Sequence, residues 1–507
     1  MSLDDLPGGG GTTVNLSLIS HTNAGKTTLA RTLLGRDVGE VRDAAHVTDI
    51  ASGYVLVQAG DDTLMLWDTP GFGDTARLLG RLRNASNPIG WLLTQVWDRW
   101  RERPLWSSQQ AVKNAREQAD VILYLVNASE DPASAAYIPL EMEVLAWIGK
   151  PVVLLLNQMG APRADSGSEV DRWLSQLSDN DMVVGAIPLD AFARCWVQEG
   201  ALLDIVEPLL PAEKRAAMAR LETRWEELNR TRFHAAMAAL APPLAAAAAD
   251  SEKVREGDWR DKLGGALSTG RTERPETRAA MTQLAERLAA GTRESTDALI
   301  RLHDLSGKAT RKVLERLAKD YARQEKTHEG AAAALGGLMS GAVTGLAADL
   351  AAGGLTLGGG MIVGGILGAL GAGGLARGVN VARGSDGSTV RWSQEFFEEM
   401  IGSAVLRYLA VAHFGRGRGD WEEGENPEFW QTMVREEVGK HSREAGRLLA
   451  QGKQQGAEPL AEPVRELLTR IAATVLTRLY PNATADLDLV GDAAPPVPDP
   501  SPASPES

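Results

Sequence analysis

The chain has 507 residues, 44% of them hydrophobic, and a formal net charge of −14. This length suffices for two or three domains with large buried cores and, with this composition, excludes a fibrous protein. Binding to nucleic acid is not expected, because it needs a basic surface that displaces counterions. The single cysteine, Cys195, excludes an internal disulfide and fits a reducing compartment, and it does not combine with the seven histidines at metal-ligand spacing.

The two ends of the sequence carry little information about the fold. Residues 1–10 begin with an acidic stretch and lack the apolar segment of a secretory signal, so we expect a flexible N-terminus and a cytoplasmic protein. Residues 482–507 are dominated by Pro, Ser, Asp and Ala, which predicts a disordered tail. The folded domains are therefore expected between these two segments.

A candidate phosphate-binding loop, residues 20–28, follows the first predicted strand. Alternating apolar residues predict a strand over 14–19, and residues 29–34 predict a helix. The loop fits the pattern G-x-x-x-x-G-K-[ST] except at its first position, where Ser20 replaces glycine. Such a loop surrounds phosphate with backbone N–H groups, a lysine and a hydroxyl that binds Mg²⁺. The predicted nucleotide-binding residues here are Ser20, Asn23, Ala24, Gly25, Lys26, Thr27 and Thr28. The alternative is an ordinary strand-to-helix turn with a solvated lysine.

A second motif, Asp68-Thr69-Pro70-Gly71, follows a strand predicted over residues 63–67. A carboxylate at this place can hold Mg²⁺, and the N–H of Gly71 can reach a γ-phosphate. Thr48 lies between the two motifs, where a mobile threonine could sense both the metal and the γ-phosphate, although a plain loop hydroxyl is the alternative. The predicted Mg²⁺ ligands are therefore Thr27, Thr48 and Asp68.

These motifs resemble the Era, EngA and TrmE group of P-loop GTPases of the TRAFAC class. The resemblance is carried by residues 23–27, Thr48 and residues 68–72. It implies GTP hydrolysis with Mg²⁺, catalytic roles for Lys26, Thr48 and Gly71, and a potassium ion at Asn23 in the role of an arginine finger. The family places an apolar residue where other GTPases have a water-orienting glutamine. Phe72 matches this, so slow intrinsic turnover is expected.

The base-reading motif departs from the family pattern. A strand over residues 151–156 leads to Asn157, which matches the first residue of the family's Asn-Lys-x-Asp motif. Gln158 replaces the lysine, and Gly160 replaces the aspartate that reads guanine. Losing such a partner lowers discrimination between bases, so the choice between GTP and ATP stays open. Ala191 is the one residue that matches the family's Ser-Ala-Lys loop behind the base.

Six strand signals alternate with helical ones over residues 13–208. This predicts an α/β P-loop NTPase (G) domain over residues 11–210, with a mostly parallel, doubly wound sheet. Residues 73–118 form a long insertion with four tryptophans. Helical spacing of apolar residues favours a helix packed on the rest of the protein. The alternative is a partner surface that responds to the nucleotide.

From residue 211 to 481 the pattern changes to long amphipathic helices without strand signals, which predicts an all-α domain. Pro242-Pro243 is expected to separate two helices, and later helices are expected over residues 393–413, 427–452 and 463–480.

A glycine-rich segment, residues 331–376, lies inside this helical region. Glycines at four-residue spacing give a glycine-zipper pattern, which suits a hairpin of two closely packed helices. The second helix would be long enough to cross a bilayer, but Asp349 would be costly there unless it sat at the turn. The hairpin is thus expected either to associate with a membrane or to be buried among helices or in a homodimer.

The combination resembles a bacterial subfamily whose C-terminal domain has unknown function. The leading hypothesis is a regulatory GTPase that relays its nucleotide state through the helical domain to a membrane or protein partner, in the cytoplasm or at the inner face of the cell membrane. A homodimer could form through the G domain or the hairpin. The alternatives are a nucleotide-gated scaffold that does not hydrolyse, and a dynamin-like protein that inserts into or remodels membranes.

Overall fold

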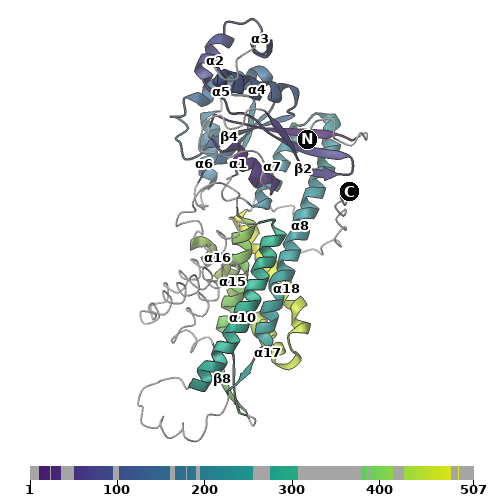
Figure 1. Cartoon of the computed structure of the whole chain (residues 1–507), viewed down its shortest axis with the longest axis vertical. Helices are drawn as coiled ribbons and strands as arrows, with labels where there is room; N and C mark the ends of the chain where they lie inside the picture. The colour runs from purple at the N-terminus through teal and green to yellow at the C-terminus, as the bar shows by residue number, and fades with distance from the viewer. Residues whose placement is uncertain are drawn as a thin grey trace, which may run out of the picture.

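The computed structural model of the protein consists of two parts joined by one long helix (Figure 1). It describes residues 11–22, 24–35, 51–94, 102–159, 166–177, 180–189, 195–254, 275–305, 379–384, 387–414, 428–480 and 489. Several predictions fall outside these residues, namely those for residues 1–10, Asn23, Thr48, Gly160, Ala191, the glycine-rich segment 331–376 and nearly all of the tail 482–507.

The first part is built on a six-stranded sheet of order β2-β3-β1-β4-β5-β6. Its strands are β1 (Thr13–Ile19), β2 (Ser52–Ala59), β3 (Asp62–Asp68), β4 (Val121–Asn127), β5 (Val152–Asn157) and β6 (Val183–Pro188). All neighbouring strands are parallel except β2, which pairs antiparallel with β3. The predicted mostly parallel sheet is confirmed, and its central strands are apolar because helices cover both faces.

Helices bury the two faces of this sheet in two separate hydrophobic cores. They are α1 (Lys26–Leu34), α2 (Thr75–Leu82), α3 (Pro88–Thr94), α4 (Arg103–Glu117), α5 (Tyr137–Ile148), α6 (Ser166–Gln176) and α7 (Trp196–Val206). The insertion forms α2, α3 and α4, which pack on this part, and the rings of Trp91 and Trp106 contact its core. We call the sheet with α1 to α7 the sheet domain.

The second part is a helix bundle, defined here as the helices from α8 onward. Its helices are α8 (Ala212–Ala249), α10 (Pro275–Leu302), α15 (Gln394–Ala412), α16 (Glu428–Lys440), α17 (Ser442–Gln455) and α18 (Ala461–Leu479). The helical fold class is confirmed. One expected helix is instead two, α16 and α17, because the backbone leaves helical geometry at His441, with φ −98° and ψ 9°.

A small antiparallel sheet at the far end of the bundle contradicts the expectation of no strands after residue 211 (Figure 1). It contains β7 (Glu252–Lys253), β8 (Val379–Gly384) and β9 (Gly387–Trp392), in the order β7-β9-β8. β8 and β9 pair antiparallel in a register that runs from Val379 opposite Trp392 to Gly384 opposite Gly387. Runs this short give a weak alternation signal, and for that reason the sequence pattern missed them.

The expected break at Pro242-Pro243 is also wrong, since α8 continues through both prolines. Proline removes a helical hydrogen bond and crowds the preceding turn, so neighbouring helices must offset this cost. They approach α8 closely here: a Cβ added to Gly291 of α10 would lie 2.9 Å from Cβ of Pro243, and one at Gly452 of α17 would lie 2.6 Å from the Ala248 carbonyl oxygen. Tertiary packing therefore overrides the local signal.

Polar contacts fasten α8 and α15 to the sheet domain. Nζ of Lys214 lies 2.7 Å from Oδ2 of Asp120, and Nε of Arg220 lies 2.7 Å from Oδ2 of Asp62 on β3. Nε1 of Trp196, the first residue of α7, donates to the hydroxyl of Tyr408 on α15 at 3.2 Å. Both parts therefore meet through side chains of several elements, not only through the continuous backbone of α8.

No helix within the described parts of the chain is both long and apolar enough to cross a bilayer. The longest, α8, alternates buried apolar residues with charged ones along its first half. The glycine-rich segment, on which the expectation of membrane association rests, lies outside the described residues.

A carboxyl pair between α7 and α8 makes the stability of the fold depend on pH. Burial and a hydrogen bond with Asp204 raise the pKa of Glu222 from 4.5 to about 8. Native protein keeps this proton over the pH range in which unfolded protein has lost it, so the free energy of unfolding falls as the pH rises from about 4.5 to about 8.

We expect Glu222→Gln to make the free energy of unfolding depend less on pH over this range, measured as denaturation midpoints at several pH values. Asp204→Asn should act in the same direction, and curves parallel to wild type would contradict the assignment.

Candidate nucleotide-binding site

The phosphate-binding loop joins β1 to α1, as predicted. Gly25 precedes the helix with φ 93°, a left-handed conformation that favours glycine. A Cβ at this position would also lie 2.8 Å from Nδ2 of Asn157. The first turn of α1 therefore starts at Lys26, with its N-terminus directed at the loop, which is the arrangement that binds phosphate.

Lys26 is nearly buried, and its ammonium group lies against oxygen atoms of the loop. Nζ donates to Oγ of Ser20 at 2.8 Å and approaches the carbonyl oxygen of His21 at 3.5 Å. Burial lowers the pKa of Lys26 to about 8, opposed by the charges of Asp68 and Glu141. Ser20, the residue that breaks the glycine pattern, thus contributes a hydroxyl that orients the lysine.

Asp68 ends β3 beside the first turn of α1. Its Oδ2 accepts a hydrogen bond of 2.6 Å from Oγ1 of Thr27. Its Oδ1 is buried and has no hydrogen-bond partner among the described residues. Burial raises the pKa of Asp68, opposed by the bond from Thr27 and the charge of Lys26. A carboxylate oxygen without a partner beside a hydroxyl is a donor set that suits Mg²⁺.

The segment after β3 lies directly on the phosphate-binding loop. The amide of Phe72 donates to the carbonyl of Ser20 at 2.9 Å, and the amide of Thr22 donates to the carbonyl of Phe72 at 3.1 Å. A Cβ at Gly71 would lie 2.9 Å from Cα of Thr22 and 3.0 Å from Nζ of Lys26, so only glycine fits. The ring of Phe72 is fully buried in the core and carries no atom that could orient water.

Asn157, at the end of β5, contacts the phosphate-binding loop. It is fully buried, and its Nδ2 donates to the carbonyl of Ala24 at 2.9 Å. The next residue, Gln158, has φ 59°, which is uncommon for a residue with a side chain. Thr28 is buried within α1. The site residues that the structure brings together are Ser20, Ala24, Gly25, Lys26, Thr27, Asp68, Gly71 and Asn157.

Sequence reasoning missed one residue of this region, Glu141 of α5. It is fully buried and accepts hydrogen bonds from three side chains, one of them His21 of the phosphate-binding loop. A signal was present, because Glu141 lies on the same helical face as Ile138, Met142 and Leu145, which are all buried. An acidic residue within an apolar stripe indicates a buried polar contact, although the pattern cannot identify its partners.

Known proteins resemble the sheet domain. Residues 15–158 match the family model described as 50S ribosome-binding GTPase. GTPase Era of Staphylococcus epidermidis is 23% identical over 198 residues, 39% of this chain and 54% of that protein, so the chain spans about half the length of this relative.

Two solved structures of Era are similar to part of this chain, with low sequence identity and low TM-scores. An Era variant of Aquifex aeolicus, bound to GDP and AlF4⁻, is 18% identical, with a TM-score of 0.27, and the match covers 39% of this chain and 57% of that one. An Era complex with MgGDPNP and a stretch of 16S ribosomal RNA is 19% identical, with a TM-score of 0.28, and covers 40% of this chain and 58% of that one.

The C-terminal part matches a second family model, over residues 186–473. This range begins within β6 and ends within α18, and it is more than half of the sequence. The expected combination of an Era-like GTPase domain with a C-terminal domain of unknown function is confirmed. The chain belongs to the family described as Domain of unknown function (DUF3482) and carries a P-loop GTPase domain at its N-terminal end.

Proposed function

We propose that this protein binds GTP and hydrolyses it to GDP and phosphate with Mg²⁺. The observation that carries the proposal is the convergence of Lys26, Thr27 and Asp68, with one buried carboxylate oxygen of Asp68 left without a partner among the described residues. Lys26 would bind the β- and γ-phosphates, and the amide of Gly71 would contact the γ-phosphate. Thr27 and Asp68 would hold Mg²⁺, which neutralises charge on the phosphates when it is bound.

Catalysis in such a site depends on positioning and charge more than on a general base. The described residues fit this, because Phe72 offers no atom to orient water and is fixed in the core. A second candidate function follows from the same observation, namely a scaffold that binds nucleotide with negligible turnover. We favour hydrolysis because the lysine, the hydroxyl and the carboxylate are all present, and we propose that intrinsic turnover is slow.

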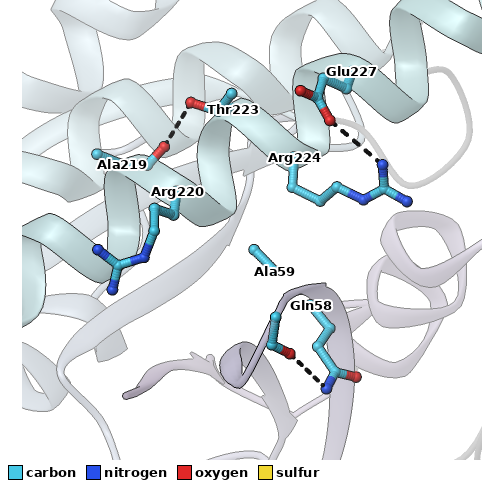
Figure 2. A pocket seen from close by; sticks show the side chains of 8 residues that line it. Gln58, Ala59, Ala219, Arg220, Thr223, Arg224 and Glu227 are labelled. Carbon is cyan, nitrogen blue, oxygen red and sulfur yellow. Dashed lines mark hydrogen bonds and ion pairs between the residues drawn. The ribbon is translucent and has the colours of Figure 1, made fainter. Parts of the chain in front are cut away.

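We further propose that the nucleotide state is relayed to the helix bundle through β2, β3 and α8. Asp68 ends β3 at the phosphates, and Asp62 begins the same strand at its pairing with Arg220 of α8. Figure 2 shows Arg220 and Arg224 of α8 beside Gln58 and Ala59 of β2. An open groove of about 630 Å³ lies between these elements, and Arg220 is one of the residues that line it.

Three finer features rest on the sequence alone, and we propose them as such. Asn23 would bind potassium, and the glycine-rich segment 331–376 would contact a membrane or a second copy of the chain. The protein would act in the cytoplasm or at the inner face of the cell membrane. No nucleic-acid partner is proposed, because the net charge of −14 disfavours one, and the RNA in the Era complex is a property of that protein.

The proposal predicts that Lys26→Ala abolishes both nucleotide binding and turnover, because the ammonium group of Lys26 is the cation that lies against the phosphate-binding loop. We expect a loss of affinity of at least about a hundredfold, as for a charged hydrogen bond in a protected site. Titrations with labelled GDP, GTP and ATP, with phosphate release in potassium and in sodium buffer, would measure this. Binding without any turnover would favour the scaffold, and equal binding of ATP would contradict guanine specificity.

The lowered pKa of Lys26 predicts that affinity for GDP depends on pH. Phosphate oxygens favour the ammonium form, so affinity should be constant below about pH 8 and fall as the pH rises above it. The slope should approach about tenfold per pH unit. A Lys26→Arg variant binds more weakly but keeps its charge, so its affinity should not follow this curve. If both proteins gave the same pH profile, Lys26 would not be the titrating group.

The relay predicts that nucleotide changes hydrogen exchange in the bundle. We expect amides of α10 and α15 to exchange differently with GDP and with a non-hydrolysable GTP analogue. Arg220→Gln, which breaks the pair with Asp62, should reduce that difference by at least about twofold. Arg287→Gln is the matched control, since it breaks a pair with Asp250 at the bundle end of α8. Equal effects of the two variants would contradict the relay.

A further inference from the structure

A fully buried carboxylate connects the phosphate-binding loop with the start of α2. Oε1 of Glu141 accepts hydrogen bonds from Nδ1 of His21 at 2.6 Å and from Oγ1 of Thr75 at 3.0 Å. Oε2 accepts a bond of 2.6 Å from the hydroxyl of Tyr124 on β4. We assign the ring proton of His21 to Nδ1, the nitrogen that faces Oε1, which makes the carboxylate oxygen the acceptor in this contact. We call Glu141 and its three donors the Glu141 cluster.

The Glu141 cluster fixes the positions of three different elements. Burying an ionised carboxylate is unfavourable unless hydrogen bonds compensate for lost water. Here the compensating donors come from the phosphate-binding loop, from α2 and from β4, so displacing any one of these elements leaves the buried charge with fewer partners. The contact therefore acts as a restraint among them, in addition to the packing of their apolar side chains.

His21 is well placed to transmit this restraint to the phosphates. Its backbone pairs with Phe72 in a parallel bridge, and its carbonyl oxygen lies 3.5 Å from Nζ of Lys26. Its ring stacks on Tyr137, with the centroids 4.3 Å apart. The ring of His21 is thus held by α5, and its backbone lies against Phe72 and Lys26.

Thr75 transmits the same restraint to the segment that follows β3. It is the first residue of α2, close after Gly71, whose amide is proposed to contact the γ-phosphate. Between them, the amide of Gly73 donates to Oγ of Ser108 at 3.1 Å, and a Cβ at Gly73 would lie 2.6 Å from Cβ of Pro104. The path from Gly71 to α2 is therefore short and closely confined by α4.

We propose that Glu141 is a positioning residue that holds α2 against the phosphate-binding loop and so sets the response of this site to a γ-phosphate. The proposal rests on the proposed nucleotide site and adds its specificity for the third phosphate. A diphosphate would contact the loop alone, whereas a γ-phosphate would contact both the loop and the amide of Gly71. The affinity for the triphosphate, but not for the diphosphate, should therefore depend on the relative position of these two segments, which Glu141 maintains.

Three substitutions test this inference in the full-length protein. Glu141→Gln keeps the shape but removes the charge, and Thr75→Val removes the hydroxyl on α2, which lies 3.0 Å from Oε1 of Glu141 and also 3.4 Å from the carbonyl oxygen of Gly73. Tyr124→Phe is the matched control, since it removes one hydroxyl donor from the same carboxylate without touching either nucleotide-contacting segment. The measurements are the dissociation constants for GDP and for a non-hydrolysable GTP analogue, kcat for GTP, and hydrogen exchange of α2 without nucleotide.

At about pH 6, well below the pKa of Lys26, we expect Glu141→Gln and Thr75→Val to leave GDP affinity within about twofold of wild type. Both should weaken binding of the GTP analogue and lower kcat by about tenfold, which is the size expected for one charged hydrogen bond. They should also raise hydrogen exchange at α2. Tyr124→Phe should lower the unfolding midpoint but keep the wild-type ratio of GTP to GDP affinity.

The inference is overturned if all three variants alter both affinities equally, or if exchange at α2 is unchanged in Glu141→Gln and Thr75→Val. The exchange measurement needs no nucleotide, so it separates this inference from the proposed function. A wild type that binds no nucleotide, with raised α2 exchange in the same two variants, would refute the proposed function while supporting the link between α2 and the loop.

Discussion

The site depends on one close approach, that of the chain after β3 to the loop after β1. Gly71 lies so near Thr22 and Nζ of Lys26 that a side chain of any size is excluded there. Backbone hydrogen bonds between Phe72 and the loop fix the distance between the two segments, and the buried ring of Phe72 packs the segment after β3 into the core. Because both segments end parallel neighbouring strands, the sheet itself brings the lysine, the hydroxyl and the carboxylate together.

The long helix α8 extends this geometry into the helix bundle. Its first half packs on the outer strands of the sheet and its second half on α10, α17 and α18. A helix that passed two prolines without support would kink or break, so the close contacts at Gly291 and Gly452 are part of what keeps α8 continuous. Continuity matters because a rigid helix fastened at both ends transmits a displacement that a broken one would absorb.

The sequence was sufficient for the parts of the fold that depend on local pattern. Strand β1, the loop and α1 could be predicted because apolar alternation gives way to a glycine, a lysine and a helical period within a few residues. Continuity of α8 could not, because partners distant in sequence decide whether the prolines are tolerated. The partners of Glu141 could not be predicted either, because they are also distant in sequence. The apolar pattern of α5 indicates that Glu141 lies on a buried face, but His21, Thr75 and Tyr124 contact it only in the tertiary fold.

The base-binding half of the site is where this chain differs most from the GTPases it resembles. Nδ2 of Asn157 donates a hydrogen bond to the carbonyl oxygen of Ala24, so it supports the loop, and Gly160 stands where the family pattern has the aspartate that reads guanine. The phosphate half keeps Lys26, Thr27 and Asp68 in place. We infer that most of the binding free energy comes from the phosphates and Mg²⁺, since charged hydrogen bonds in a buried site are the strong ones. Such a site would distinguish triphosphate from diphosphate more sharply than one base from another, and in the relay proposed above the γ-phosphate is the change that β3 and α8 would transmit to the bundle.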